Sequence, residues 1–436
     1  MTFLLIGSPP LFAQGGIRID AGTVIRDASK DYGRLSAQML RAAQESYTLS
    51  EDVSIKSPLR CVSLNRLEKA MATGETITEE MKYLAGIQRI THVFYFPDSK
   101  DIVIAGPAEG WFPGYEGAML GRESLQPVCE LQHLITALRA YAPNKEGAGL
   151  VTCSIDPTEE GNARLQQFQA QFRGFNQRQF LTGVIQSLGK QVIQVEGIPE
   201  TTHAAQMMVA ADYRMKRIGL GLDPLRVPGL QTFIANTEPN AGNALFRWYF
   251  TPNYDSVILT EDRTGMQLVG DGVQLVGANE IVSESGERTI VDRALDPGTA
   301  AFTQSFTQLY PEIVRQALVF GQLRNWIDML ICAAHIQRED FYGQSGWSME
   351  FFGDETKYPL ETFVAAKEVE PVVATKTVNV RGVRRTLAPI AGGIEIQPEL
   401  ALTDENARRD IDGSIAKQRE QISLNLPDGV WWWDVK

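Results

Sequence analysis

The sequence predicts an α+β fold, with a mixed sheet that has helical crossovers in the middle of the chain. We expect hairpins on either side of this sheet and a pair of helices near residues 300–338. Three observations lead to this prediction: short alternating apolar runs, longer runs with helical spacing, and Gly, Pro and Asp clusters that separate them. With 436 residues, at roughly 100 to 200 residues per domain, we expect two or three domains.

The first third of the chain mixes short strands and helices. Alternation predicts a hairpin over Ile17–Arg26 and two strands on either side of the turn residues Pro97 to Lys100. A Gly-rich aromatic loop follows at 106–121. The expected strands here are Thr91–Phe96 and Asp101–Ala105, and the expected helices are Leu35–Tyr47, Asn65–Thr73 and Glu79–Leu84.

The middle of the chain alternates between strands and helices, in an order that suggests helical crossovers. We expect helices at Glu130–Tyr141, Pro157–Phe172, Gln177–Leu188 and Ala204–Ile218, and strands at Leu150–Ile155 and Gln191–Glu196. Hairpins should follow over Leu245–Val282, because Met266–Val269 and Val273–Val276 are near-mirror strands around an Asp-Gly turn.

The last third predicts helices over Ala300–Arg338, strands at Val372–Val383 and Gly393–Ile396, and a charged helix at Asp404–Ile422. The domain ranges that follow are 1–14 as a signal-peptide remnant, 15–148 as an N-terminal α+β domain, 149–295 as a middle α/β region with hairpins, and 296–436 as C-terminal helices plus strands.

The net charge of −12 argues against a nucleic-acid partner and against docking on an anionic membrane. The basic stretch Lys376–Arg385 is interpreted as the solvated face of a strand. The most apolar run, Trp326–Ile336, is far shorter than the ~20 residues of a crossing helix, so we expect a buried core helix and no transmembrane segment.

The N-terminus, MTFLLIGSPPLFAQ, is apolar and has a small residue, Ala13, that suits signal-peptide cleavage. It predicts export, hence an extracytoplasmic protein of the periplasm or cell surface; the alternative is an apolar first strand. The cysteines have no CxxC spacing. Cys129 and Cys153 each lie near a predicted strand and can pair in a disulfide, whereas Cys332 is expected to be a packed free thiol.

Five stretches resemble a family of secreted or envelope-associated planctomycete bacterial proteins of unknown function. They are GGIRIDA from Gly15, MKYLAGIQRITHVFYFPDSKDIVIAGPAEGW from Met81, CSIDPTEEG from Cys153, AADYRMKRIGLGL from Ala210 and RWYFTPNYD from Arg247. The resemblance implies export and a bacterial envelope setting. It assigns no catalytic residue.

Known catalytic signatures are absent from the sequence. The four histidines occur in neither HExxH nor HxH spacing, and the chain has no GxSxG elbow and no phosphate-binding GxxxxGK[ST] loop. We therefore predict no metal ligands and no cofactor.

Carboxylates are the remaining catalytic candidates: Glu109, Asp101, Asp156 and Asp212. Asp156 also fits a helix N-cap, which is the structural interpretation. For ligand binding we select Trp111, which follows a strand, together with Arg214 and Arg217, which share a helix face and can clamp an anion. The alternatives are a core tryptophan and a surface ladder that includes an Asp212–Lys216 pair.

Interface candidates lie near the C-terminus. Three consecutive tryptophans, Trp431, Trp432 and Trp433, cannot all face one side of a strand. The predicted helix Asp404–Ile422 carries a thin apolar stripe of Ile411, Ile415 and Ile422, which contacts either its own domain or another subunit.

Together these features predict an exported envelope or scaffold protein that acts by binding or self-assembly, with itself or another envelope protein as its partner. We expect binding in preference to catalysis. Two alternatives stay open: a carboxylate-based hydrolase or lyase, and a protein that binds a small anionic ligand or a sugar.

Overall fold

The computed structural model describes most of the 436-residue chain. The described residues are 17–19, 24–27, 34–74, 76–114, 117–173, 176–237, 244–283, 285, 287–292, 294–374, 378–380, 383–385, 390–422 and 424–435. The predicted signal-peptide remnant 1–14 and the side chains of the basic stretch Lys376–Arg385 lie outside them.

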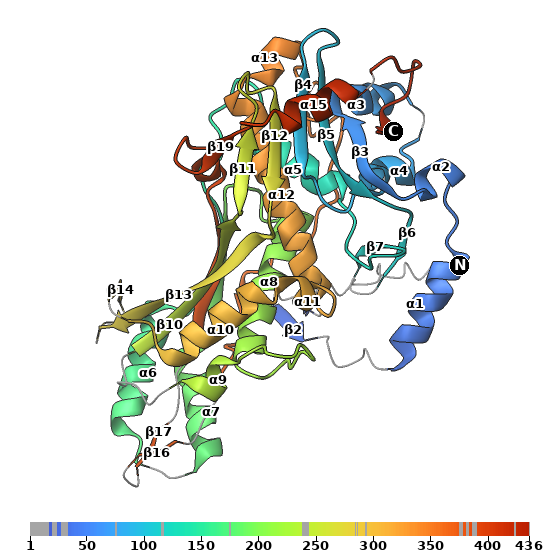
Figure 1. The fold of residues 1–436 in the computed structure, drawn as a ribbon. Helices are drawn as coiled ribbons and strands as arrows, with labels where there is room; N and C mark the ends of the chain where they lie inside the picture. The colour runs from blue at the N-terminus through green and yellow to red at the C-terminus, as the bar shows by residue number, and fades with distance from the viewer. Residues whose placement is uncertain are drawn as a thin grey trace, which may run out of the picture.

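Two large β-sheets organise the fold (Figure 1). Among the described residues, the first has nine strands in the order β1-β2-β15-β9-β8-β18-β10-β13-β14. Their bounds are β1 Ile17–Ile19, β2 Val24–Asp27, β8 Val151–Asp156, β9 Gln191–Glu196, β10 Ala244–Asn253, β13 Gly272–Val282, β14 Arg288–Ile290, β15 Glu368–Val369 and β18 Ile390–Ile396. Pairing is mixed, because β10–β18 and β2–β15 are parallel and the other neighbours antiparallel.

The second sheet has seven strands within the same described residues, in the order β19-β11-β12-β4-β5-β3-β20. Their bounds are β3 Ser57–Ser63, β4 His92–Phe96, β5 Asp101–Ala108, β11 Ser256–Leu259, β12 Gly265–Val269, β19 Ala407–Arg409 and β20 Trp432–Asp434. Two small hairpins complete the strands: β6 (Trp111–Pro113) with β7 (Met119–Gly121), and β16 (Val378–Val380) with β17 (Val383–Arg385).

Helices cover the sheets and fill the space between them (Figure 1). Their bounds are α1 Arg34–Ser46, α2 Glu51–Ser54, α3 Leu64–Thr73, α4 Glu79–Lys82, η2 Leu84–Gly86, α5 Leu131–Ala140, α6 Glu159–Gln171, α7 Gln177–Leu188, α8 His203–Gly219, α9 Phe233–Asn236, α10 Pro297–Gln308, α11 Tyr310–Val314, α12 Leu318–Arg338, α13 Phe341–Ser345, α14 Pro398–Ala401 and α15 Ser414–Gln421. The α+β prediction is confirmed. The strands β8 and β9 are connected through α6 and α7 and pair antiparallel.

One long hairpin links the two sheets. β10 and β13 pair in the nine-stranded sheet, and the chain between them forms β11 and β12, which pair in the seven-stranded sheet. The predicted pairing of Met266–Val269 with Val273–Val276 is therefore wrong. Gly270 and Gly272 have φ of +93° and +76°, a conformation that favours glycine. Gly270 lies between β12 and β13 and Gly272 begins β13, where the chain runs from the seven-stranded sheet to the nine-stranded sheet.

A buried ion network holds this passage in place. Arg89 donates from Nε to Asp328 Oδ2 at 2.7 Å and from Nη1 to the carbonyl of Gly270 at 2.6 Å. The hydroxyl of Tyr254 donates to Asp328 Oδ1 at 2.6 Å. Because Arg89, Tyr254 and Asp328 come from three distant segments, the network joins the hairpin to helix α12.

Helix α12 is the centre of the core. Almost all of its residues are buried, and the predicted core helix Trp326–Ile336 is confirmed. The main core cluster includes residues of all three predicted domain ranges, for example Val62, Met208 and Trp326. No helix of the described residues has the length and apolar character that membrane crossing requires. The domain boundaries stay a prediction.

Two local predictions are corrected. Cys129 and Cys153, like the other two cysteines, are buried free thiols, so the considered disulfide is not formed. The helix expected over Asp404–Ile422 is only Ser414–Gln421, because Gly413 has a φ of +66° at its start and the preceding residues form β19. A helix cannot continue through that left-handed conformation.

Candidate functional site

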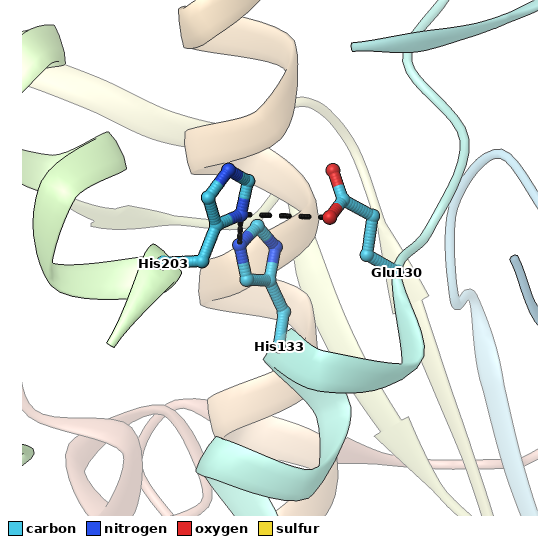
Figure 2. Close-up of side chains that lie close together, drawn as sticks. All are labelled: Glu130, His133 and His203. Atoms are coloured by element: carbon cyan, nitrogen blue, oxygen red, sulfur yellow. Dashed lines mark hydrogen bonds and ion pairs between the residues drawn. The ribbon is translucent and has the colours of Figure 1, made fainter. Parts of the chain in front are cut away.

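Three side chains with metal-ligating atoms meet where helix α5 approaches helix α8 (Figure 2). Glu130 is the N-cap residue of α5, and His133 lies three residues later on the same side of its first turn. His203 is the first residue of α8, whose start is fixed by the Thr202 side chain accepting from the Ala205 amide at 3.2 Å. The starts of two helices thus supply the three groups, with His133 and His203 70 residues apart in the chain.

The ligand atoms converge closely. His133 Nε2 lies 2.8 Å from His203 Nδ1, and His203 Nδ1 lies 3.5 Å from Glu130 Oε2. The two imidazole rings are stacked, with centroids 4.9 Å apart and planes 18° apart. Glu130 and His133 are only 6% and 2% exposed, so this is a buried polar cluster.

Neighbouring amides and rings position these groups. The Gln132 Nε2 donates to Glu130 Oε2 at 2.6 Å, and Gln322 Nε2, from α12, lies 3.4 Å from Glu130 Oε1. Trp326 of α12 packs edge-on against His133. Second-sphere contacts of this kind fix the direction of metal-binding side chains.

The protonation states suit metal binding. Burial raises the pKa of Glu130, but the two histidines and the amides of Gln132 and Gln322 more than offset this, so its pKa lies below the usual value. Burial lowers the pKa of His133 to about 4. At neutral pH, Glu130 is therefore ionised and His133 neutral, which are the forms that bind a metal ion.

The geometry fits a small divalent ion. Zinc lies about 2.0–2.1 Å from nitrogen and oxygen ligands in a tetrahedron, which places ligand atoms roughly 3.3 Å apart. The observed separations of 2.8 and 3.5 Å lie on either side of that value. Two histidines and a glutamate are also a ligand set that zinc uses in proteins. Without an ion, a single proton between the two ring nitrogens satisfies them.

Two of the predicted catalytic carboxylates, Asp101 and Glu109, accept hydrogen bonds from neighbouring side chains and backbone amides. Asp101 accepts from Ser63 Oγ at 2.6 Å and from Arg66 Nε at 2.9 Å. Glu109 accepts from the Gln88 amide and, at 2.9 Å, from the backbone of Ser124. Both acids belong to the region around β5.

The other two carboxylates lie at the nine-stranded sheet, so the four do not share a cleft. Asp156 is not the N-cap of α6; Thr158 is, and its side chain accepts from the Gly161 amide at 3.0 Å. Asp156 instead pairs with Arg288 at 3.0 Å and with Arg247 at 3.4 Å. The Asp156 carboxylate is therefore bound by arginines of β14 and β10 and does not cap the helix.

Asp212 forms the predicted pair with Lys216, at 3.1 Å. Both side chains are fully buried, so the interpretation as a surface ladder is wrong. Arg214 pairs with Asp223 at 3.1 Å, and Arg217 lies over the ring of Tyr213. Each arginine thus has a partner close to its own helix.

The predicted tryptophan sites lie largely in the core. Trp111 is fully buried, and Trp431 is 7% exposed in the main core cluster. Trp432 packs on the same cluster beneath the guanidinium of Arg60, 4.6 Å from the ring, and Trp433 packs on the opposite side of the seven-stranded sheet. Both sheet faces are covered, which explains how three consecutive tryptophans are accommodated within one chain. A contact with another chain stays a prediction.

The isoleucine stripe divides in the same way. Ile415 and Ile422 are buried against the seven-stranded sheet, whereas Ile411 is 95% exposed and lies outside helix α15. The three do not form one continuous helical stripe.

Sequence reasoning missed the cluster at Glu130. The spacing Glu-x-x-His at the start of a predicted helix is present in the sequence, but it is a weaker signal than the zinc motifs that place two histidines close together. His203 lies at the start of another helix, and nothing local connects it to the first two residues.

Comparison with known proteins gives one family. Residues 153–233 match the model of a family described as Protein of unknown function (DUF1598). This DUF1598 segment runs from strand β8 to the first residue of α9, less than half of the chain. None of the curated proteins matches the chain, and no solved structure does.

The DUF1598 segment contains only part of the candidate site. It includes His203, whereas Glu130 and His133 precede it. It also contains the buried pair Asp212–Lys216. The similarity agrees with the expected resemblance to a family of unknown function and adds no activity.

Proposed function

We propose that this protein binds a divalent transition-metal ion, zinc in particular, through Glu130, His133 and His203. The observation that carries the proposal is the convergence of two ring nitrogens and one carboxylate oxygen in a buried position. Zinc suits a mixed nitrogen and oxygen set better than magnesium or calcium, which prefer oxygen ligands alone.

The role that burial favours is structural. Helix α5 packs against α12, and α8 packs on strands β8 and β18 of the nine-stranded sheet. An ion bound between the starts of α5 and α8 would link the α5–α12 helix pair to α8 on the nine-stranded sheet. A bound ion adds free energy to the folded state alone, so it stabilises the protein by about 2.7 kcal/mol at an ion concentration 100 times Kd.

The test measures metal content and stability together. Purified protein is stripped with chelator, reloaded with Zn²⁺ and analysed by elemental mass spectrometry and thermal melting. We expect one equivalent of zinc and a rise in Tm in the wild type, and loss of both in His203→Ala. His335→Gln, which alters another buried histidine, is the matched control and should still bind. Wild-type protein that takes up no zinc, or His203→Ala that binds as well, would refute the proposal.

A second function, proposed for the same protein, is assembly in an envelope setting outside the cytoplasm. Its support is the position of β20 at the edge of the seven-stranded sheet. Trp432 and Trp433 there line a concavity of about 460 Å³, together with Asp52 and Ile55. An open strand edge of this kind can pair with the same edge of a second copy.

Strand geometry gives a sharp test of this assembly. The carbonyl of Trp431 and the amide of Val435 bond inward to β3 at 2.9 and 3.1 Å, so the backbone of Trp432 faces outward in the alternating pattern. Trp432→Pro removes an outward donor, and Trp432→Phe is the control. We expect a dimer by light scattering for the wild type and the Phe variant, and a monomer for the Pro variant. A monomeric wild type contradicts assembly.

A further inference from the structure

A polar concavity lies over the face of the nine-stranded sheet that α8 and α10 do not cover. Its volume is about 490 Å³, which falls within the range of small-molecule sites. Three central strands, β10, β13 and β18, form its floor, and α14 with the turn after it forms one wall.

Strand alternation explains why the floor is polar. Trp248 and Phe250 of β10 point to the other face, where Trp248 contacts Phe302 of α10. Tyr249 and Thr251 therefore face the concavity, and register places Thr251 opposite Gln274 of β13. Strand pairing and alternation therefore place these polar side chains next to one another on one face of the sheet.

Several of these groups have no hydrogen-bond partner in the part of the chain that the structure describes. Among the described residues, no intramolecular hydrogen bond involves the side chains of Tyr249, Thr251, Asn253 or Gln274, although two hydroxyls and two amides are all strong bonding groups. They come from neighbouring strands and line one volume. Tyr249, Thr251 and Gln274 are half-buried and Asn253 is exposed, so their polar groups are open to water or to a ligand in the concavity.

The charge of the lining selects the class of ligand. The ionisable carboxylate is Glu395 of β18, to which Gln397 donates at 3.4 Å, and no lysine, arginine or histidine is among the lining residues. An anion would be repelled. Amides that both donate and accept, a carboxylate that accepts, and the ring of Tyr249 together match the hydroxyls and the apolar face of a sugar.

We propose that this concavity binds a neutral saccharide. It stands apart from the metal cluster and does not depend on it. Gln274 and Asn253 hydrogen-bond the ligand hydroxyls, Glu395 accepts from a further hydroxyl, and Tyr249 packs against the sugar ring.

The experiment uses the full chain and named probes. Saturation-transfer NMR is recorded with glucose, galactose, N-acetylglucosamine, cellobiose, lactose and the anionic sugar glucuronate, each at millimolar concentration. Any neutral sugar that gives a signal is titrated for Kd. We expect binding by at least one neutral sugar, and weaker or no binding by glucuronate.

Variants assign the binding to this concavity. Gln274→Ala and Asn253→Ala each remove an amide without breaking an internal bond, so they should fold normally and weaken the Kd about tenfold, or about 1.4 kcal/mol. The control is Gln194→Ala, an exposed amide on β9 of the same sheet, which should bind like the wild type.

Three results would overturn the proposal. The first is no signal from any neutral sugar with the wild type. The second is equal Kd values for wild type and both concavity variants, which would place the binding elsewhere. The third is a preference for glucuronate over the neutral sugars, which the Glu395 carboxylate forbids.

Discussion

Removing Lys216 should destabilise the protein in a pH-dependent way. Lys216 Nζ donates to Asp212 Oδ2 at 3.1 Å and to the carbonyl of Ile155 at 2.7 Å, and neither side chain is exposed. Lys216→Met keeps the length of the side chain but leaves Asp212 without its counter-charge. Loss of one partner of a buried pair typically costs about 3–5 kcal/mol.

The magnitude depends on whether Asp212 is ionised. Burial raises its pKa to about 6 from 3.8, with Lys216 opposing the shift. Because the folded pKa exceeds the unfolded one, this carboxyl favours folding below pH 3.8, and that contribution is lost as the pH rises through 6. Without Lys216 the folded pKa rises further.

At pH 8 we therefore expect Lys216→Met to lose about 3–5 kcal/mol of unfolding free energy. At pH 5 the protonated Asp212 is neutral, and the cost should fall to the lost hydrogen bonds, about 1–2 kcal/mol. Urea unfolding followed by tryptophan fluorescence at both pH values measures the difference. The double variant Lys216→Met with Asp212→Asn should recover much of the loss at pH 8. Equal costs at both pH values would refute this reasoning.

Three further outcomes can be checked by thermal or urea unfolding. Burial lowers the pKa of His335 to about 3, so the neutral ring's contribution to stability is present above pH 6.5 and is lost as the pH falls toward 3. His335→Met should therefore lessen the drop in Tm between pH 7 and pH 5. Arg89→Met leaves Asp328 buried without its cation and should cost about 3–5 kcal/mol, whereas a cost below about 1 kcal/mol would show that the network is dispensable. Ile415→Ala should cost about 2–4 kcal/mol and Ile411→Ala almost nothing, and similar costs for the two would contradict the packing of α15.

Local pattern predicted the elements whose periodicity agrees with their burial. Helix α12 and strands β4 and β5 are examples, because their apolar spacing continues without interruption. The prediction failed where one residue changes the chain direction. Gly413 delays the start of the predicted charged helix to Ser414, and Gly270 separates two strands that look like a hairpin but belong to different sheets.

The candidate site was only partly readable for the same reason. Glu130 and His133 are neighbours in one helical turn, so their proximity follows from the sequence. His203 joins them only because α5 and α8 pack together, and that packing depends on the whole core. The concavity proposed to bind a saccharide is harder to predict, since β18 with Glu395 lies more than 100 residues from β10 and β13, which supply most of its polar groups.

The continuous hairpin through both sheets has a consequence for ligand selection. The concavity includes Tyr249 on β10 and Val257 on β11, which belong to different sheets but to one uninterrupted stretch of chain. The Arg89–Asp328–Tyr254 contacts join that stretch to helix α12, so we expect the concavity to keep its width when a ligand binds. A preorganised site spends little entropy on binding and discriminates by shape. Ligands that differ by a single ring substituent should accordingly be distinguished on contact, with no closing movement of the protein.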